Sequence, residues 1–347
     1  VERFDISYGR LVVDDVVLKP YQAPPSSQGG MMMSPMAGLE GMLAITRAFG
    51  IDAMAGLDLK LDMVMTQDNQ PISLAYGIKT MGARGMRGSD LDASFARDIS
   101  YSFDFGSNPI AAGIPGKMDF AIGYFGLKDV RLDKFYGELA KGEMPALTET
   151  DLWSLGLWRS ENVSLKVADK PVFTAAETVL DARKFHWLVP TDLQASARGV
   201  IIDFESVASL ASAFGAGDYG DFDYGLQQFL DGVNLMKAHG LSRPSLNFAF
   251  GWNWNADNGD ARMNFGFGGD DLINIDARYE GMLPSYKAVT SLVPSDPSRA
   301  NSEAIARVFS DQSKVRLVEV NVADNGGLGK MFGLASDIIR ETGGVDM

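Results

Sequence analysis

The sequence predicts an α+β protein that is predominantly β: an extended curved antiparallel sheet of amphipathic meanders, with short helices between them. Three observations predict this fold class. Strands with regular apolar/polar alternation recur along the chain, turn residues separate neighbouring strands, and a helix-then-meander unit occurs twice. Alternation gives each strand one apolar face, and antiparallel pairing through short turns joins such faces into one sheet.

The most regular strand pattern covers residues 57–65, with Asp58, Lys60 and Asp62 at the polar positions. After a turn at 68–71 the alternation resumes over 72–78, which predicts a hairpin. Before it, the apolar spacing over 38–49 is helical, and Gly50 is a candidate C-cap. The apolar face of the hairpin carries Leu57, Leu59, Leu61, Met63, Met65, Leu74, Tyr76 and Ile78.

A second hairpin is predicted over residues 248–267, where aromatic residues occupy every second position. Its turn is Asp257-Asn258-Gly259, and Asn-Gly is a strong hairpin signal. Small or polar residues fill the other face. The aromatic face carries Phe248, Phe250, Trp252, Trp254, Phe265 and Phe267, with Met263 among them. These side chains contact either the protein's own core or an apolar ligand.

Further elements follow from the same periodicities. Helices are predicted over 132–140, 205–214, 224–239 and 328–340, and strands over 4–8, 11–18, 99–105, 118–122, 163–167, 193–202, 273–279 and 315–322. The order helix, glycine, strand, turn, strand occurs at 38–95 and again at 225–279. We therefore predict two repeat regions, residues 1–190 and 191–347, joined in one continuous sheet.

The composition narrows the function. The 347 residues are 46% hydrophobic and 22% charged, an ordinary globular balance. A formal net charge of -14 repels nucleic acid, which we exclude as a partner. The absence of cysteine excludes disulfides and thiolate chemistry. The chain opens on Val1 within a strand pattern. We expect that an N-terminal signal or anchor was removed, although a chain trimmed for expression would begin in the same way.

Catalytic and metal-binding signals are scarce. Of the two histidines, His186 lies in a strand pattern and His239 precedes Gly240 at a helix end, where a cationic ring is favoured. No Gly-x-Ser-x-Gly motif occurs, and the histidines lack metal-ligand spacing. Residues 215–220 match Gly-x-Gly-x-x-Gly, but a helical pattern precedes them, which favours a linker. The sequence predicts no catalytic residue, no cofactor and no metal site.

Two clusters leave alternatives open. Asp218, Asp221 and Asp223 could hold calcium, but the terminal Glu of an EF-hand is missing. The Met31–Met36 loop offers thioethers suited to Cu(I). Methionine is also the adaptable apolar residue of binding surfaces, so a lid or a contact onto an apolar groove is the favoured interpretation.

A family resemblance adds to this reading. Asp-x-Gly-Leu, then an Ala and a helix ending at Gly, occurs at 324–344, and related fragments occur at 223–240 and 126–142. This alternation of short helix and amphipathic meander resembles the AsmA-like and YdgA-like envelope proteins of Gram-negative bacteria. The resemblance implies a curved β-sheet in the periplasm, tethered to the inner membrane, with a role in lipid movement or outer-membrane homeostasis. The given residues depart from the pattern of that group in not including an N-terminal membrane helix, which we expect was removed.

These observations favour non-enzymatic binding of a lipid or other apolar ligand in a groove formed by the two apolar hairpin faces. The alternative is a structural or interaction protein of the envelope, which docks a protein partner through its acidic exterior or an edge strand and carries no lipid. An enzyme is a third class, and it would need carboxylates such as Asp203 and Glu205, which share a strand face.

Overall fold

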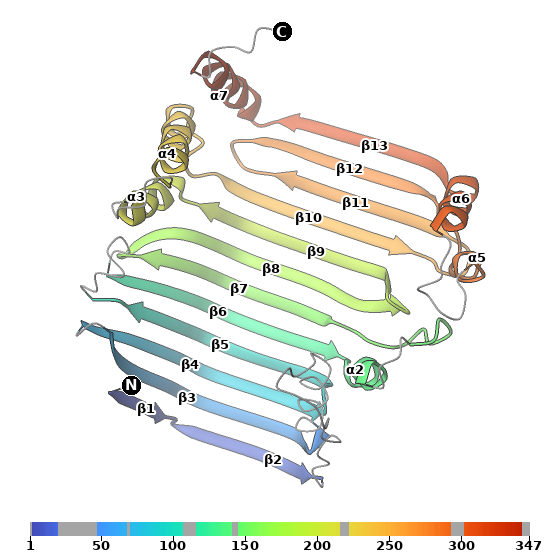
Figure 1. Ribbon diagram of the computed structural model, residues 1–347, viewed down its shortest axis with the longest axis horizontal. Helices are drawn as coiled ribbons and strands as arrows, with labels where there is room; N and C mark the ends of the chain where they lie inside the picture. Colours follow the sequence, from blue (N-terminus) through green and yellow to red (C-terminus); the bar gives the residue numbers. More distant parts are fainter. Residues whose placement is uncertain are drawn as a thin grey trace, which may run out of the picture.

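The computed structural model describes residues 2–19, 47–67, 70–106, 116–140, 145–215, 222–292 and 302–341. Within these ranges the chain forms one long open antiparallel sheet of 13 strands with a few short helices (Figure 1), which confirms the predicted fold class. From β3 onwards each strand pairs with the next strand in sequence, so the sheet is a continuous meander. The boundary predicted near residue 190 falls inside β9, and the sheet continues across it.

Most of the strands are longer than those that the alternation indicated. They are β1 (Arg3–Ser7), β2 (Arg10–Leu18), β3 (Phe49–Gln67), β4 (Gln70–Arg87), β5 (Leu91–Asp104), β6 (Lys117–Val130), β7 (Gly156–Val167), β8 (Lys170–His186), β9 (Val189–Ile202), β10 (Ser245–Trp254), β11 (Asp260–Gly268), β12 (Ile273–Met282) and β13 (Lys314–Asp324). Both β1 and β2 pair with β3, end to end along its edge. Within the described part of the chain, β13 is therefore one edge of the open sheet, and β1 and β2 together form the other edge.

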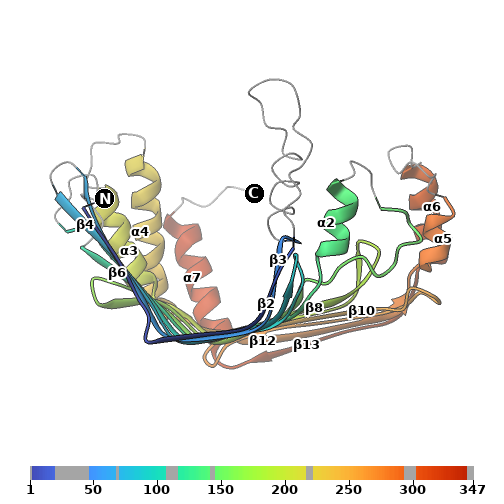
Figure 2. The same cartoon turned by 90° about the horizontal axis from the view of Figure 1, so that it is seen from below.

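Six described helices stand along the two walls of a trough that the sheet forms (Figure 2). Helices α3 (Phe204–Gly215), α4 (Phe222–Ala238) and α7 (Gly327–Glu341) lie at one wall, and α2 (Asp133–Ala140), α5 (Tyr286–Thr290) and α6 (Ser302–Gln312) lie at the other. Four of them match the predicted helices, whereas α5 and α6 were not expected. None of the helices in the described ranges is long and apolar enough to span a bilayer.

The predicted helix over 38–49 lies mostly outside the described residues. Its proposed end is wrong, because Phe49 and Gly50 already belong to β3 and pair with β2 and β4. The second predicted turn is confirmed: Gly259 adopts a φ of 83°, and the Asn255 side chain accepts hydrogen bonds from the backbone N–H groups of Asp257 and Asn258.

A row of left-handed residues, which we call the crease, crosses the sheet and contributes to its bending. Its members lie on alternate strands with φ between 50° and 57°: Asp58, Asp98, Asn162 and Gly199. The strand registers bring Lys79, Gly123 and Ala176 of the intervening strands into the same row. A left-handed residue departs locally from the extended conformation of a strand, and Asp, Asn and Gly adopt this conformation most readily. The crease therefore bends the sheet towards the trough of Figure 2.

The alternation of apolar residues shifts by one position at the crease. In β7, Trp158 lies in an apolar row before Asn162, whereas Val163 and Leu165 continue such rows after it. Next to the crease, Ile78 is 8% exposed and Ala175 is 2% exposed, as expected for side chains on the inner side of a bend. The shift thus keeps the apolar rows on the inner face of the trough.

Candidate ligand-binding site

The first predicted hairpin forms part of one wall. Its pairing is confirmed, with Leu59, Leu61, Met63 and Met65 of β3 opposite Ile78, Tyr76, Leu74 and Ile72 of β4. Leu57 differs from the rest, because it precedes Asp58, pairs with Thr80 and is 44% exposed. The crease therefore separates Leu57 from the row that continues through Leu59 and Leu61.

Aromatic side chains extend this wall onto the next strands. Tyr76 pairs with Tyr101 of β5, and Leu74 pairs with Phe103. The rings of Phe103 and Phe105 lie 4.4 Å apart. Together with Met118, Phe120 and Leu165 they line a hollow of about 430 Å³. The first predicted set thus borders an apolar hollow but does not enclose one.

The second predicted hairpin lies at the opposite end of the sheet, with β5 to β9 between the two. Phe248 pairs with Phe267, and Phe250 pairs with Phe265. The Phe248 and Phe265 rings meet edge to face at 5.7 Å. Both predicted sets are apolar rows of one sheet, but they are far apart and cannot contact the same small molecule.

A half-open apolar cavity lies at the end of the aromatic row. Trp252 and Trp254 form its floor, and Tyr286 and Val289 of α5 and Phe309 of α6 cover it. Its volume is about 420 Å³, within the range of small-molecule sites. Because α5 and α6 stand on the inner side of the trough (Figure 2), the aromatic row faces the interior. We call this space the corner cavity.

The corner cavity is deep at one side and open at the other. Trp254 is 7% exposed and Pro284 is less than 2% exposed. Val189 and Phe309, by contrast, are 38% and 41% exposed. These two residues therefore mark a mouth through which a ligand can enter from solvent.

Three tryptophan indoles line the corner cavity, and their N–H groups differ in bonding. Trp252 Nε1 donates to the Pro190 carbonyl at 2.9 Å. Trp187 Nε1 donates to the Pro145 carbonyl at 3.2 Å. Trp254 Nε1 is buried and has no hydrogen-bond partner among the residues that the structure describes. One buried indole donor is thus left unsatisfied within the described part of the chain.

Trp187 also shows backbone strain. Its φ of 55° places a bulky residue in the left-handed region, which costs energy and which only over-determined surroundings maintain. Here the surroundings are hydrogen bonds: the Trp187 N–H donates to the Thr150 carbonyl, and the Trp187 carbonyl accepts from Trp153 Nε1. These hydrogen bonds maintain the strained conformation and thereby hold the Trp187 ring at the wall of the corner cavity.

Among the residues that the structure describes, no side chain lining the corner cavity is charged at neutral pH. The one ionisable group in this described lining is Tyr286, and burial raises the pKa of its phenol above the ordinary value of 10.0. The Tyr286 hydroxyl donates to the Leu147 carbonyl at 2.7 Å, so its own donor is satisfied. The lining therefore suits an uncharged apolar ligand.

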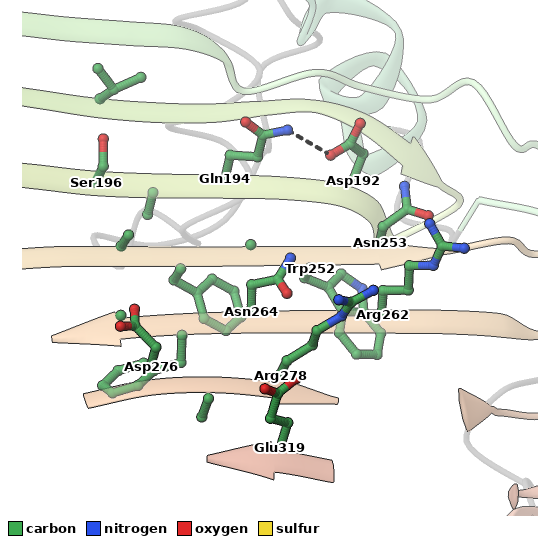
Figure 3. A pocket seen from close by; sticks show the side chains of 18 of the residues that line it. Asp192, Gln194, Ser196, Trp252, Asn253, Arg262, Asn264, Asp276, Arg278 and Glu319 are labelled. Atoms are coloured by element: carbon green, nitrogen blue, oxygen red, sulfur yellow. Dashed lines mark hydrogen bonds between the residues drawn. The ribbon is translucent and has the colours of Figure 1, made fainter. Parts of the chain in front are cut away.

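A larger polar hollow, which we call the outer hollow, lies on the opposite face of β9 to β13 (Figure 3). Its volume is about 920 Å³, and Gly251 and Gly266 form part of its floor. A Cβ atom at Gly251 would come no closer than 3.8 Å to other atoms, so the hollow is open there. Polar and charged side chains surround it, including Gln194, Asn253, Asn264, Arg262 and Arg278. It offers hydrogen bonds and charge as well as apolar contact, since Phe250, Trp252 and Phe265 also contribute to its lining.

The carboxylates weighed for an enzyme have structural partners. Asp203 Oδ1 accepts a hydrogen bond from the Ser206 N–H at the start of α3. Glu205 accepts from Lys237 Nζ at 2.6 Å and from the Ser242 hydroxyl at 2.8 Å. Lys237, followed by Ser242, holds the pKa of Glu205 below its ordinary value. These contacts join the start of α3 to the end of α4.

The histidines likewise contact protein groups. His239 Nε2 lies 2.9 Å from Asp337 Oδ2 of α7, so the ring links α7 to the end of α4. The His186 ring packs edge to face against Tyr286 at 4.2 Å. The Met31–Met36 loop and the Gly-rich segment 216–221 lie outside the described residues.

Sequence patterns identified two of the residues that form the corner cavity. Trp252 and Trp254 belonged to the predicted aromatic row, whereas the residues that cover them come from the turn between β8 and β9 and from α5 and α6. The apolar cluster around residues 283–289 could have predicted this cover, because an apolar segment that follows a strand is expected to pack over an apolar surface.

The chain matches no known protein-family model, and neither curated proteins nor solved structures give a significant match.

Proposed function

We propose that the trough binds a lipid or other apolar small molecule without chemical conversion, and that the corner cavity is where the ligand is held. The observation that carries the proposal is the corner cavity itself: a space of about 420 Å³ with a half-open mouth and aromatic walls, whose lining among the described residues bears no charged side chain. A cavity of this kind is the usual site of small apolar ligands.

Binding would be driven by apolar burial. Removing alkyl surface from water contributes roughly 25 cal/mol per Å². The exposed aromatic row beyond the cavity, which includes Phe248 at 38% exposure, offers further apolar surface to a ligand that extends out of the mouth. Burial alone supplies the affinity in this proposal, and no bond is made or broken.

Native mass spectrometry of the freshly purified protein, followed by organic extraction, tests the proposal. We expect a bound apolar molecule, or uptake of one on incubation with a lipid extract. In Val289→Trp the new ring would fill the corner cavity from α5, and we expect the bound mass to be lost. Gly251→Leu adds a similar apolar side chain to the outer hollow and should leave binding unchanged. Retained binding in Val289→Trp with a folded spectrum would contradict the proposal.

A second function is favoured by one observation, the exposed edge strand β13. Every residue of β13 is solvent-exposed, with Val315 at 68% and Val318 at 63%. Such an edge can accept an extended segment of a partner protein as a further strand. A stable protein complex that contains no extractable apolar molecule would favour this function over ligand binding. The periplasmic location and the resemblance to envelope proteins stay predictions.

A further inference from the structure

We propose that copies of this protein associate head to tail, with the β13 edge of one copy pairing with the β2 edge of the next, so that the trough continues from copy to copy. The inference goes beyond the proposed function, because the contact needs no ligand. It begins from the two edges at opposite ends of the sheet (Figure 1). Every residue of β2 and of β13 is exposed, and an open edge is where a further strand can be added.

The directions of the two edge strands suit this contact. Every strand pairing on the path from β2 to β13 is antiparallel, and the number of pairings is odd. The two edge strands therefore run in opposite directions. A second copy shifted along the sheet presents its β2 antiparallel to β13, which is the pairing used throughout the meander.

The faces and the backbone groups of the two edges also match. A register row, meaning residues directly opposite one another on successive strands, runs unbroken from Leu11 to Val322. A second row runs from Val13 to Val320, and both rows pass through the aromatic row of the inner face. Pairs along a row alternate between hydrogen-bonded and non-hydrogen-bonded. Because an odd number of pairs joins them, Leu11 and Val322 direct their backbone groups either both into the sheet or both out of it, so the free groups of the two edges are in phase.

The charges of the two edges are complementary in this orientation. Each strand is basic at its start and acidic further along: Lys314, Arg316 and Glu319 on β13, and Arg10, Asp14 and Asp15 on β2. Antiparallel pairing brings the basic start of one strand beside the acidic part of the other, and opposite charges across a strand pair stabilise it. Arg316 also pairs with Asp260 at 2.9 Å, but a guanidinium has donors for a second carboxylate.

Charge also selects the register of the contact. If each row simply continued into the next copy, Glu319 would lie opposite Asp14, and like charges directly opposite are destabilising. A shift of two residues keeps every side chain on its own face, because the side-chain period of a strand is two. This shift places Arg316 opposite Asp15 instead.

The helix that follows β13 extends the contact. Gly9 separates β1 from β2 at the crease, where its N–H donates to the Leu57 carbonyl beside Asp58. Since β13 shares its rows with β2, the chain after β13 lies on the side of the crease on which β1 lies. There α7 exposes Phe332 at 70%, and β1 exposes Phe4 at 54%. In the stack, α7 of one copy packs beside β1 of the next and buries apolar side chains that a single copy exposes.

Three lysine variants in one register row test this inference. Val320→Lys blocks the β13 edge, Val13→Lys blocks the β2 edge, and Leu180→Lys is the matched control in the middle of the same row. Each replaced side chain is at least 36% exposed, so a lysine can reach solvent in the single copy. Analytical ultracentrifugation of the full chain measures association, in about 0.15 M salt because the net charge of -14 makes copies repel at low ionic strength. Circular dichroism establishes that each variant is folded.

We expect the unmodified chain to form dimers, trimers and longer species as its concentration rises, because a head-to-tail contact does not close. Each edge variant should raise the apparent Kd of association by about tenfold or more, since a lysine on an edge strand opposes pairing. Leu180→Lys should leave the apparent Kd unchanged. A mixture of the two edge variants should form a dimer and no longer species, because each variant keeps the edge that the other lacks.

An unmodified chain that stays monomeric at about 100 µM would overturn the inference, since a specific contact between copies would be populated there. A mixture of edge variants that stays monomeric would overturn it as well. So would a Val13→Lys variant that dimerises alone, because β13 would then pair with itself. Loss of association in Leu180→Lys would assign the contact to the inner face rather than to the edges, and would equally overturn it.

Discussion

The two faces of the same strands differ sharply at the end of the sheet where β10 to β13 lie. On the inner face, Trp252 and Trp254 form the floor of an apolar cavity that helices cover. On the outer face, the alternate residues of the same strand, Gly251 and Asn253, border the outer hollow. Strand alternation alone makes this difference possible, because successive side chains point to opposite faces. The contrast shows that the helices lie over the inner face, whose apolar side chains gain free energy from burial.

The largest expected difference between the faces is in stability. Trp254→Ala removes a large buried side chain, and we expect a loss of about 3–5 kcal/mol in the free energy of unfolding. Asn253→Ala, one residue away on the exposed outer face, should change it by no more than about 0.5 kcal/mol. Denaturant titration of both variants measures the difference. Equal effects would show that the inner face is not the packed one.

The crease offers the next largest effect, because it keeps apolar rows on the inner face. In Asn162→Val a β-branched residue must adopt a left-handed conformation, which costs about 1–2 kcal/mol. Asn162→Gly removes that cost and should lie closer to the original stability. Thermal unfolding compares the two variants directly. A valine variant as stable as the glycine variant would contradict the assignment of strain to this row.

A smaller effect concerns the phenol at the corner cavity. Tyr286→Phe loses the hydrogen bond to the Leu147 carbonyl, worth about 1 kcal/mol. Because burial raises the pKa of Tyr286, the unfolded chain ionises first, near pH 10.0, and stability falls as the pH rises from there through the folded pKa. The phenylalanine variant should lose this part of the alkaline dependence. Unfolding measured between neutral pH and the alkaline limb would detect the change in slope.

The smallest effect lies outside the cavity, at the junction of α3 and α4. Lys237 and Ser242 hold the pKa of Glu205 below its ordinary value of 4.5. The contact therefore stabilises the fold above that pH and weakens as the pH falls through the lower folded value. We expect Glu205→Gln to reduce the acid dependence slightly and to leave ligand binding unchanged. Loss of binding in this variant would connect Glu205 to the site.

Periodicity predicted most of the fold, since the strands with strict alternation and the helices α2, α3, α4 and α7 all have local signals. The crease has none. Asp58 occupies a polar position of a regular strand and looks like a surface residue. Only the registers of neighbouring strands show that it aligns with Asp98 and Asn162.

The corner cavity was predictable only in part for a related reason. The aromatic row gave Trp252 and Trp254, but the cover comes from segments distant in sequence, and α5 spans only Tyr286–Thr290. A helix this short has too few residues for a periodic signal. Its position above the row follows from the path of the chain after β12, which the sequence pattern does not specify.

The meander order of the strands makes the trough modular. Because each hairpin adds two strands about 4.8 Å apart, inserting or deleting one would change the length of the trough by roughly 10 Å and leave its cross-section the same. The cross-section depends instead on where the left-handed residues fall within each strand. Length and curvature are therefore encoded separately, and evolution can adjust the span of the apolar surface without altering the bend.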